Sequence, residues 1–317
     1  MIESDVERTY LLHEIKGKVG AIYMIEKGPG FLRDCVLGKE GWIPTDQICD
    51  WRIGQRDYDE ITYEKAKELA ELNIKDIVKM ARWNKRHNIS VFRLSSNIFP
   101  RFTDAEVESY TIDFAKDLLK LAGDYCRERC PQRFLMHPGQ YNQVGANTRK
   151  VFESTVLDLS HHADILDAMG VDENGVLIVH GGGMYGDKDA TIRRWIEQYD
   201  DLPKNVRNRL VLENCEKCYS TRDCLTISEE TGVPVVYDCH HYDCYSILHP
   251  DEVQETPEEL LPEVFDSWGS KRVVMHVSEQ GSGRVGHHSD FISRLPQYMI
   301  DVPTLLNRGV DIEVEAK

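Results

Sequence analysis

The sequence has no apolar run close to the roughly 20 residues that a membrane-spanning helix requires. It also lacks low-complexity segments, short internal repeats and any linker rich in proline, glycine and serine. With 41% hydrophobic and 29% charged residues, the composition excludes a membrane protein, a collagen and a disordered tail. A chain of 317 residues can bury a large core without disulfide bonds, either as one large α/β domain or as two ordinary domains.

Positive charge is scarce. The chain has 38 Lys and Arg against 54 Asp and Glu, which gives a formal net charge of -16. An overall field of this sign repels nucleic acid and gives no support to a polyanionic partner. It fits a protein that gathers carboxylates around bound cations, and the 12 histidines are a further supply of metal ligands.

The amino terminus and the cysteines predict the compartment. Residues 1–7 are acidic and no basic stretch leads into an apolar one, so we expect no secretory signal. The nine cysteines are odd in number and scattered, a pattern typical of reduced thiols. We therefore expect a cytoplasmic protein.

Short apolar runs alternate with amphipathic helical stretches along the chain. Strands are predicted at residues 18–25, 91–96, 134–137, 176–180, 209–213, 233–238, 272–277 and 311–315, and helices at 63–87, 104–130, 148–169, 189–198, 220–231, 257–268 and 290–306. Eight such units predict a closed (β/α)8 TIM barrel, an α/β fold, formed by residues 1–317 as a single domain. A doubly wound open sheet is the alternative. The length beyond a typical barrel falls mainly in an insertion at about residues 26–61 after the first strand.

Six consecutive apolar runs end in residue types that bind metals. A parallel barrel gathers the carboxyl ends of its strands around one mouth, so these side chains are expected to converge. A single His or Glu after a strand is usually an ordinary loop residue, but six in succession disfavour that interpretation. Imidazole and carboxylate together suit Zn, Mn or Fe better than Ca or Mg. The residues are His137, His180, Glu213, Asp238 with His241, His276 and Glu315.

Three other motifs have two interpretations each. Cys215 and Cys218 have the spacing of half a zinc site, but no second pair stands at a fitting distance, so packed thiols are favoured. Residues 181–183 are three glycines that either cradle a phosphate or form an open turn. Arg93 and the polar residues 95–97 either contact phosphates or form a plain turn after the second strand.

The chain resembles the UV damage endonucleases, a family of barrel enzymes related to endonuclease IV. The resembling segments occur in the family's order and cover the chain from about residue 62 to its end. They are FRLSSNIFP at 92–100, HPGQY at 137–141, VHGGGMYGDK at 179–188, LEN at 212–214, VVYDCHH at 235–241, HVSE at 276–279, HHSD at 287–290 and EAK at 315–317.

This resemblance implies a monomeric DNA repair enzyme that cuts damaged double-stranded DNA on the 5′ side of ultraviolet photoproducts and leaves a 3′-hydroxyl. It implies two or three divalent metal ions per chain, manganese in the first place and zinc as the alternative. Gln140 and Tyr141 match the pair that wedges into the duplex and probes the base stack at the lesion. The implied metal ligands are His137, His180, Glu213, Asp238, His241, His276, His288 and Glu315.

The sequence departs from the family at two positions of the site. The family tends to show a His shortly after the Phe-Pro of the second strand, where this chain has residues 101–104, so Asp104 is a candidate replacement ligand. Val274 stands where the family has a metal-bridging lysine.

Phosphodiester hydrolysis needs a nucleophile at neutral pH and stabilisation of charge at phosphorus, both of which paired metal ions supply. The catalytic set is predicted as Glu213, Asp238, His241 and Glu315, in which the carboxylates bridge ions and the imidazole sets their positions. Two alternatives stay open: a metal-dependent sugar isomerase or epimerase on the same barrel, and a non-catalytic lesion-binding relative of the nucleases.

Overall fold

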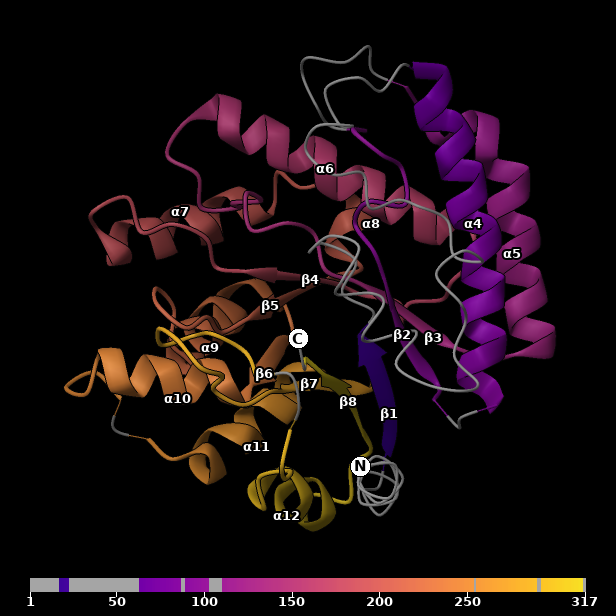
Figure 1. Cartoon of the computed structure of the whole chain (residues 1–317). Helices are drawn as coiled ribbons and strands as arrows, with labels where there is room; N and C mark the ends of the chain where they lie inside the picture. The colour runs from indigo at the N-terminus through magenta and orange to yellow at the C-terminus, as the bar shows by residue number, and fades with distance from the viewer. Residues whose placement is uncertain are drawn as a thin grey trace.

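In the computed structural model, eight parallel strands form a closed barrel in which each strand pairs with its neighbours in the chain and β1 pairs with β8 (Figure 1). The structure describes residues 17–22, 63–86, 89–102, 110–253, 255–289 and 292–315. The strands are β1 Gly17–Ile22, β2 Val91–Leu94, β3 Arg133–Met136, β4 Leu177–His180, β5 Leu210–Glu213, β6 Val235–Asp238, β7 Val273–Val277 and β8 Val310–Val314. The predicted TIM barrel is confirmed.

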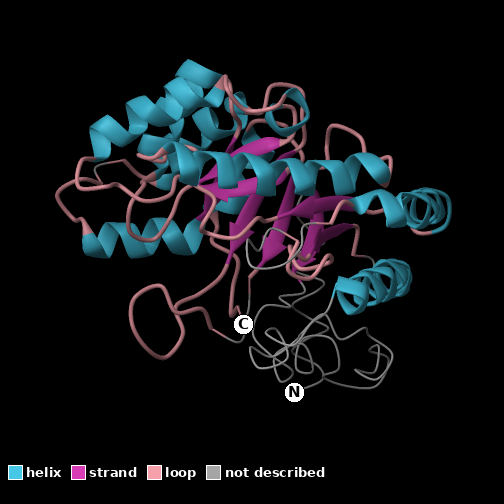
Figure 2. Ribbon diagram, turned by 90° about the horizontal axis from the view of Figure 1, so that it is seen from above, coloured by secondary structure: helices cyan, strands magenta, loops and turns pink. Residues whose placement is uncertain are grey.

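The helices surround the strands, which lie at the centre of the molecule in Figure 2. Their amphipathic patterns explain this, since buried residues such as Leu69, Ile74 and Ile77 of the first described helix line one face. The helices are α4 Tyr63–Arg86, α5 Lys116–Arg129 after the 3-10 helix η2 Ile112–Ala115, α6 Arg149–Ala168, α7 Lys188–Tyr199, α8 Lys204–Arg207, α9 Thr221–Thr231, α10 Cys239–Leu248, α11 Pro257–Ser267 and α12 Tyr298–Leu305. None of these described helices has the length and apolar character needed to cross a membrane.

Two predicted helices are shorter than expected. Within the described part of 104–130, the chain is not helical until η2, whose start is capped by the Thr111 hydroxyl accepting from the Asp113 N–H. The helix predicted at 290–306 covers only α12, because the N–H groups of Ser293 and Arg294 donate to the Glu279 carboxylate at 2.5 and 3.1 Å. Pro296 also disfavours the helical conformation of the residue before it.

Two helices were not predicted, α8 and α10. Helix α10 begins directly after β6, in the interval between the strand predicted at 233–238 and the helix predicted at 257–268. The expected insertion at 26–61 and residue Asp104 lie outside the described residues, so the single-domain organisation with its insertion stays a prediction.

Alternation along the strands divides the side chains between the barrel interior and the helices. In β7, Val274 and His276 pair in register with Asp311 and Glu313 of β8, which places these four residues on the same face. Side chains of β3, β5 and β7 contact one another although these strands are not neighbours, so that face is the barrel interior. The interior is therefore charged as well as apolar.

At the amino-terminal end of the strands, Asp311 joins two arginines inside the barrel wall. Its carboxylate is fully buried and accepts from Arg133 Nη1 at 2.8 Å and from Arg272 Nε at 2.5 Å. Arg133 also donates to the carbonyls of Asn174 and Arg272. One acidic side chain thus links β3, β7 and β8.

Replacing Asp311 by alanine should strongly destabilise the barrel. The substitution leaves two guanidinium groups without their anionic partner, a change that costs about 3–5 kcal/mol when the pair is buried. The free energy of unfolding in urea measures this cost. Asp124→Ala is the control, because Asp124 pairs with Lys120 and Arg127 on the surface of α5 and its loss should change stability little. Equal stabilities of the two variants would contradict the structural role of Asp311.

Candidate metal centre

The predicted site residues converge at the mouth of the barrel. They come from the carboxyl ends of six consecutive strands, β3 to β8, as the parallel topology requires. Two histidines do not come from strand ends: His241 lies in the first turn of α10, and His288 lies in the segment between β7 and α12. The residues brought together are His137, His180, Glu213, Asp238, His241, His276, His288 and Glu315.

Glu213 is the centre of this arrangement. Its fully buried carboxylate has one oxygen, Oε2, at 2.8 Å from His137 Nε2 and 3.5 Å from His180 Nε2. The other oxygen, Oε1, lies 2.9 Å from His276 Nδ1 and 3.3 Å from His241 Nδ1. A single carboxylate therefore contacts four imidazoles that come from four different elements.

The ligand atoms form three overlapping groups. In each group one atom per residue lies within 4.8 Å of the others, which is the spacing expected around a shared cation. Glu213 belongs to two groups and Asp238 to two, so the groups run continuously across the mouth. They are His137 with His180 and Glu213, Glu213 with Asp238 and His241, and Asp238 with His276 and Glu315.

Asp238 has two structural roles at the end of β6. Its Oδ1 accepts from the His241 N–H at 2.7 Å and so caps the amino terminus of α10. The Asn214 side chain holds the same residue, accepting from the Asp238 N–H and donating to its carbonyl. The second oxygen, Oδ2, is buried without a hydrogen-bond partner. A buried carboxylate oxygen left unpaired and aimed at histidines fits a cation.

His288 lies at the rim. Its Nδ1 is 2.9 Å from the carbonyl oxygen of Glu315 and 3.7 Å from the carboxylate of the same residue. Its ring packs edge-on against the rings of His240 and His241. His288 thus contacts members of the cluster without belonging to any of the three groups.

The electrostatics of the cluster follow from its burial. Burial opposes the ionised form of Glu213, but the imidazoles of His276 and His180 outweigh it and hold the pKa of Glu213 well below its usual range. Burial likewise opposes protonation of His241 and His276, but Asp238 and Glu213 raise the pKa of His241 well above the usual range, and Glu213, with Glu313, raises that of His276. Without a metal, these histidines therefore keep their protons, and a metal ion has to displace them.

One residue of the interior, Glu313, was not predicted as part of the site, and Arg93 was considered only as a phosphate contact or part of a turn. Glu313 is fully buried, and its Oε2 lies 3.0 Å from His276 Nε2. Arg93 places its Nη1 2.7 Å from the Glu315 carboxylate and 3.6 Å from that of Glu313. Arg93 is therefore engaged with buried acids. The signal for Glu313 was available, because it stands two residues before Glu315 on the same strand.

The sequence differs from the family at positions 274 and 104, and the structure describes only the first of them. Val274 is fully buried in β7, one inward-facing position below His276. It provides no metal ligand. Asp104 lies outside the described residues, and its assignment as a ligand stays a prediction.

Gln140 and Tyr141 are exposed on the loop that follows His137. The Tyr141 ring is 60% exposed, and its hydroxyl donates to Asp158 at 3.0 Å. A Cβ at position 139 would lie 2.4 Å from the Tyr141 ring, so Gly139 is required for this ring position. Neither Gln140 nor Tyr141 belongs to a ligand group of the described residues.

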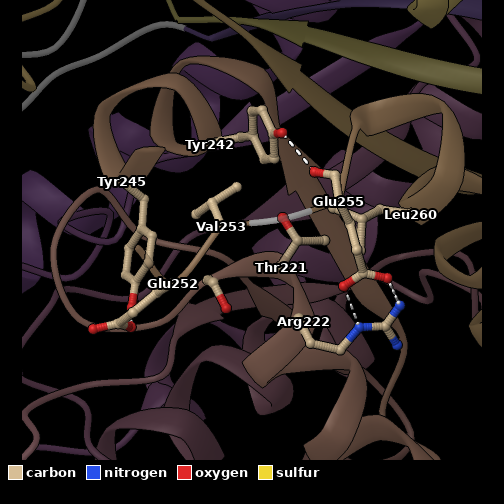
Figure 3. Close-up of a pocket in the computed structure, with 9 residues that line it drawn as sticks. Thr221, Arg222, Tyr242, Tyr245, Glu252, Val253, Glu255 and Leu260 are labelled. Atoms are coloured by element: carbon tan, nitrogen blue, oxygen red, sulfur yellow. Dashed lines mark hydrogen bonds and ion pairs between the residues drawn. The ribbon is translucent and has the colours of Figure 1, made fainter. Parts of the chain in front are cut away.

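A separate pocket of about 290 Å³ lies between α9, α10 and the segment before α11 (Figure 3). Arg222 at its edge donates to the carboxylates of Glu255 and Glu263, and the Tyr242 hydroxyl donates to the Glu255 carbonyl. The arginine is thus already paired with acids, and none of the predicted site residues lines this pocket.

The fold and the site define a class: a parallel eight-stranded barrel whose mouth carries overlapping groups of imidazoles and carboxylates. The donor set suits divalent transition metals, in particular Mn or Zn. The family model of the UV-endonuclease UvdE matches residues 47–317. The chain belongs to this family, as its resemblance implied.

Individual relatives agree with this assignment. The Acanthamoeba polyphaga mimivirus protein named "Putative UV-damage endonuclease" is 34% identical over 262 residues, which are 80% of this chain and 78% of that protein. The crystal structure of SacUVDE is 28% identical with a TM-score of 0.73, and the alignment covers 95% of this chain and 93% of that one. Endonuclease IV from Thermus thermophilus shares the fold. It is 16% identical with a TM-score of 0.51, and the alignment covers 75% of this chain and 87% of that one.

The stability of the metal-free protein should decrease as the pH rises above neutrality. The raised pKa of His241 and His276 means that their contribution is fully present below the usual value of 6.5 and is lost as the pH passes their higher values in the folded state. The lowered pKa of Glu213 acts in the opposite direction, since its contribution is present above 4.5 and is lost in acid. Urea unfolding of chelator-treated protein at about pH 6 and about pH 9 measures the difference.

His276→Gln is the test variant for this dependence. It removes one of the two titrating imidazoles, so the loss of stability between about pH 6 and about pH 9 should be smaller than in the wild type. His249→Gln, at the partly exposed residue that ends α10 and in no ligand group of the described residues, is the matched control. An identical pH dependence in wild type and His276→Gln would contradict the charge arrangement around Glu213.

Proposed function

We propose that this chain is a metal-dependent DNA repair endonuclease that hydrolyses the phosphodiester on the 5′ side of ultraviolet photoproducts and of other lesions. Membership of the UV-endonuclease UvdE family supports DNA cleavage. The observation that carries metal dependence is the continuous series of ligand groups that share Glu213 and Asp238. Family membership disfavours the sugar isomerase or epimerase alternative, since the barrel epimerases share only the fold with this chain.

The proposed cofactor is a set of two or three divalent ions, manganese in the first place with zinc as the alternative. When bound, such ions supply a hydroxide nucleophile and neutralise charge at the phosphate. The shared carboxylates Glu213 and Asp238 would bridge neighbouring ions, and Glu315 would complete the third group. The backbone carbonyl oxygen of Asn214 lies 2.9 Å from His241 Nδ1 and fixes the orientation of the imidazole ring. The proposed ligands are the eight residues brought together at the mouth, with Asp104 as a further candidate.

The proposed substrate is damaged double-stranded DNA. Gln140 and Tyr141 are exposed beside the mouth, on the loop that leads away from His137. In this position an amide fills a gap in base pairing and an aromatic ring stacks on a base, the two contacts that a lesion-probing wedge needs. The Tyr141 hydroxyl donates to Asp158, and 60% of the residue is exposed.

We also propose that the protein is a monomer and acts in the cytoplasm. The seven cysteines among the described residues are free thiols, as expected for a reducing compartment. The size of the particle in solution, measured by light scattering with and without damaged DNA, tests the monomer.

A nicking assay tests the function itself. Wild-type protein reloaded with Mn²⁺ should nick irradiated plasmid, and EDTA should abolish the activity. Glu213→Gln keeps the side-chain shape but removes the negative charge that holds the cations, so nicking should fall by orders of magnitude. Glu230→Gln, an exposed residue of α9, is the matched control and should nick as the wild type does.

Metal analysis accompanies this assay. The wild type should hold two or three divalent ions per chain after reloading, and Glu213→Gln should hold fewer. Full nicking activity in Glu213→Gln would contradict the proposed centre. Metal binding without any nicking by the wild type would instead support the non-catalytic lesion-binding alternative.

Tyr141→Ala separates lesion recognition from chemistry. Loss of one stacking surface, worth about 1–3 kcal/mol per base, should weaken the preference for irradiated over undamaged duplex. Metal content should stay unchanged, because Tyr141 is in no ligand group. Competition binding in solutions of increasing salt measures the preference, and overall affinity should fall with salt.

Tyr125→Ala is the control for this substitution, since Tyr125 is also exposed but lies on α5. It should keep the wild-type preference. Unchanged selectivity of Tyr141→Ala would contradict the wedge assignment, and loss of metal would contradict the separation of the loop from the centre.

A further inference from the structure

The turn after β5 holds a pair of cysteines that the proposed function does not use. Cys215 follows Asn214 and is buried, with 6% of its surface exposed. Its sulfur accepts the backbone N–H groups of Cys218 and Tyr219, both at 3.2 Å. Two backbone hydrogen bonds of this turn therefore hold the Cys215 sulfur in one position.

The Cys215 sulfur lies next to the metal centre. One ligand atom each of His180, Cys215 and Glu216 lie within 4.8 Å of one another, and this group shares only His180 with the three groups around Glu213 and Asp238. His180 joins the two arrangements, because its Nε2 is also 3.5 Å from the Glu213 carboxylate. The geometry is that of a fourth ligand group at the edge of the mouth.

The chemistry of this group differs from that of the others. It alone among the four contains sulfur, and thiolate with imidazole selects zinc and other soft cations, whereas carboxylate and water suit manganese. A cation bound here must displace the proton of the Cys215 thiol. Zinc does so at cysteine sites in general.

We propose that His180, Cys215 and Glu216 form a thiolate-containing metal position at the edge of the barrel mouth, which binds Zn²⁺ or another thiophilic divalent cation. This proposal deepens the proposed function and rests on it in one respect, since His180 is shared with the metal centre. The sulfur ligand distinguishes the position from its neighbours and makes the edge of the centre selective for a softer metal. Packing of two thiols without any metal is the competing interpretation.

Cobalt is the probe for this position, because thiolate coordination to Co²⁺ gives a charge-transfer band in the near ultraviolet that imidazole and carboxylate ligands do not give. Full-length protein is stripped with chelator, kept reduced and titrated with Co²⁺. The band should appear, should disappear on addition of Zn²⁺ and should persist in excess Mn²⁺. Cys215→Ser should lose the band and hold about one ion fewer per chain, while the remaining Co²⁺ stays bound.

Cys218→Ser is the matched control. Residue 218 lies in the same turn and donates its backbone N–H to the Cys215 sulfur, but it belongs to no ligand group of the described residues. It should keep the band. Loss of the band in Cys218→Ser with retention in Cys215→Ser would overturn the assignment to Cys215. A wild type that binds Co²⁺ without the band would overturn the thiolate position.

A second measurement avoids dependence on the folding of Cys215→Ser. X-ray absorption at the zinc edge of wild-type protein loaded with Zn²⁺ should show a sulfur ligand at about 2.3 Å. Zinc bound with only nitrogen and oxygen ligands would overturn the proposal. The nicking assay distinguishes the two proposals. Nicking in Mn²⁺ by a protein that gives no cobalt band would support the endonuclease and contradict the thiolate position. A cobalt band without nicking would support the thiolate position and contradict the endonuclease.

Discussion

The buried negative charge of Glu213 is the constraint on which the rest of the site depends. An uncompensated carboxylate in the interior costs several kcal/mol, so the fold must supply positive charge next to it. Four imidazoles lie 2.8–3.5 Å from it, in β4, β7, α10 and directly after β3, and the raised pKa of two of them, His241 and His276, supplies this charge. Only a closed barrel brings these elements to one point. The same charge that requires protonated histidines without a metal would be satisfied by cations when they bind.

Strand β8 extends this constraint along the barrel axis. Its inward positions are all acidic: Asp311, Glu313 and, just past its end, Glu315. Asp311 at the closed end is neutralised by two arginines and Glu315 at the mouth by Arg93, whereas Glu313 between them faces His276. Arginines therefore pair with the acids at both ends of this row. The acid between them also contacts an imidazole, which can exchange a proton for a metal ion.

The sequence was sufficient for the barrel and for convergence of the site, because strand ends in a parallel barrel share one mouth. The sequence was insufficient to predict a helix whose first turn is capped by the last residue of a strand. Asp238 both ends β6 and caps α10, so no loop marks the start of that helix and the helix was not predicted. The helix expected at 290–306 shortened because the Glu279 carboxylate, distant in sequence, binds its N–H groups. Contacts of this kind are tertiary and leave no periodic signal.

The net charge of -16 and a DNA substrate are compatible once the position of the charge is considered. Part of the acid lies inside the barrel, where Glu213, Asp238 and Glu313 are fully buried and face imidazoles. Cations bound to these carboxylates, as proposed, would give the mouth a field opposite in sign to the average over the surface. Composition reports that average, and it excludes a polyanionic partner only when the acids face the solvent. The alternation of the strands turns these acids inward, and the inference from total charge fails for that reason.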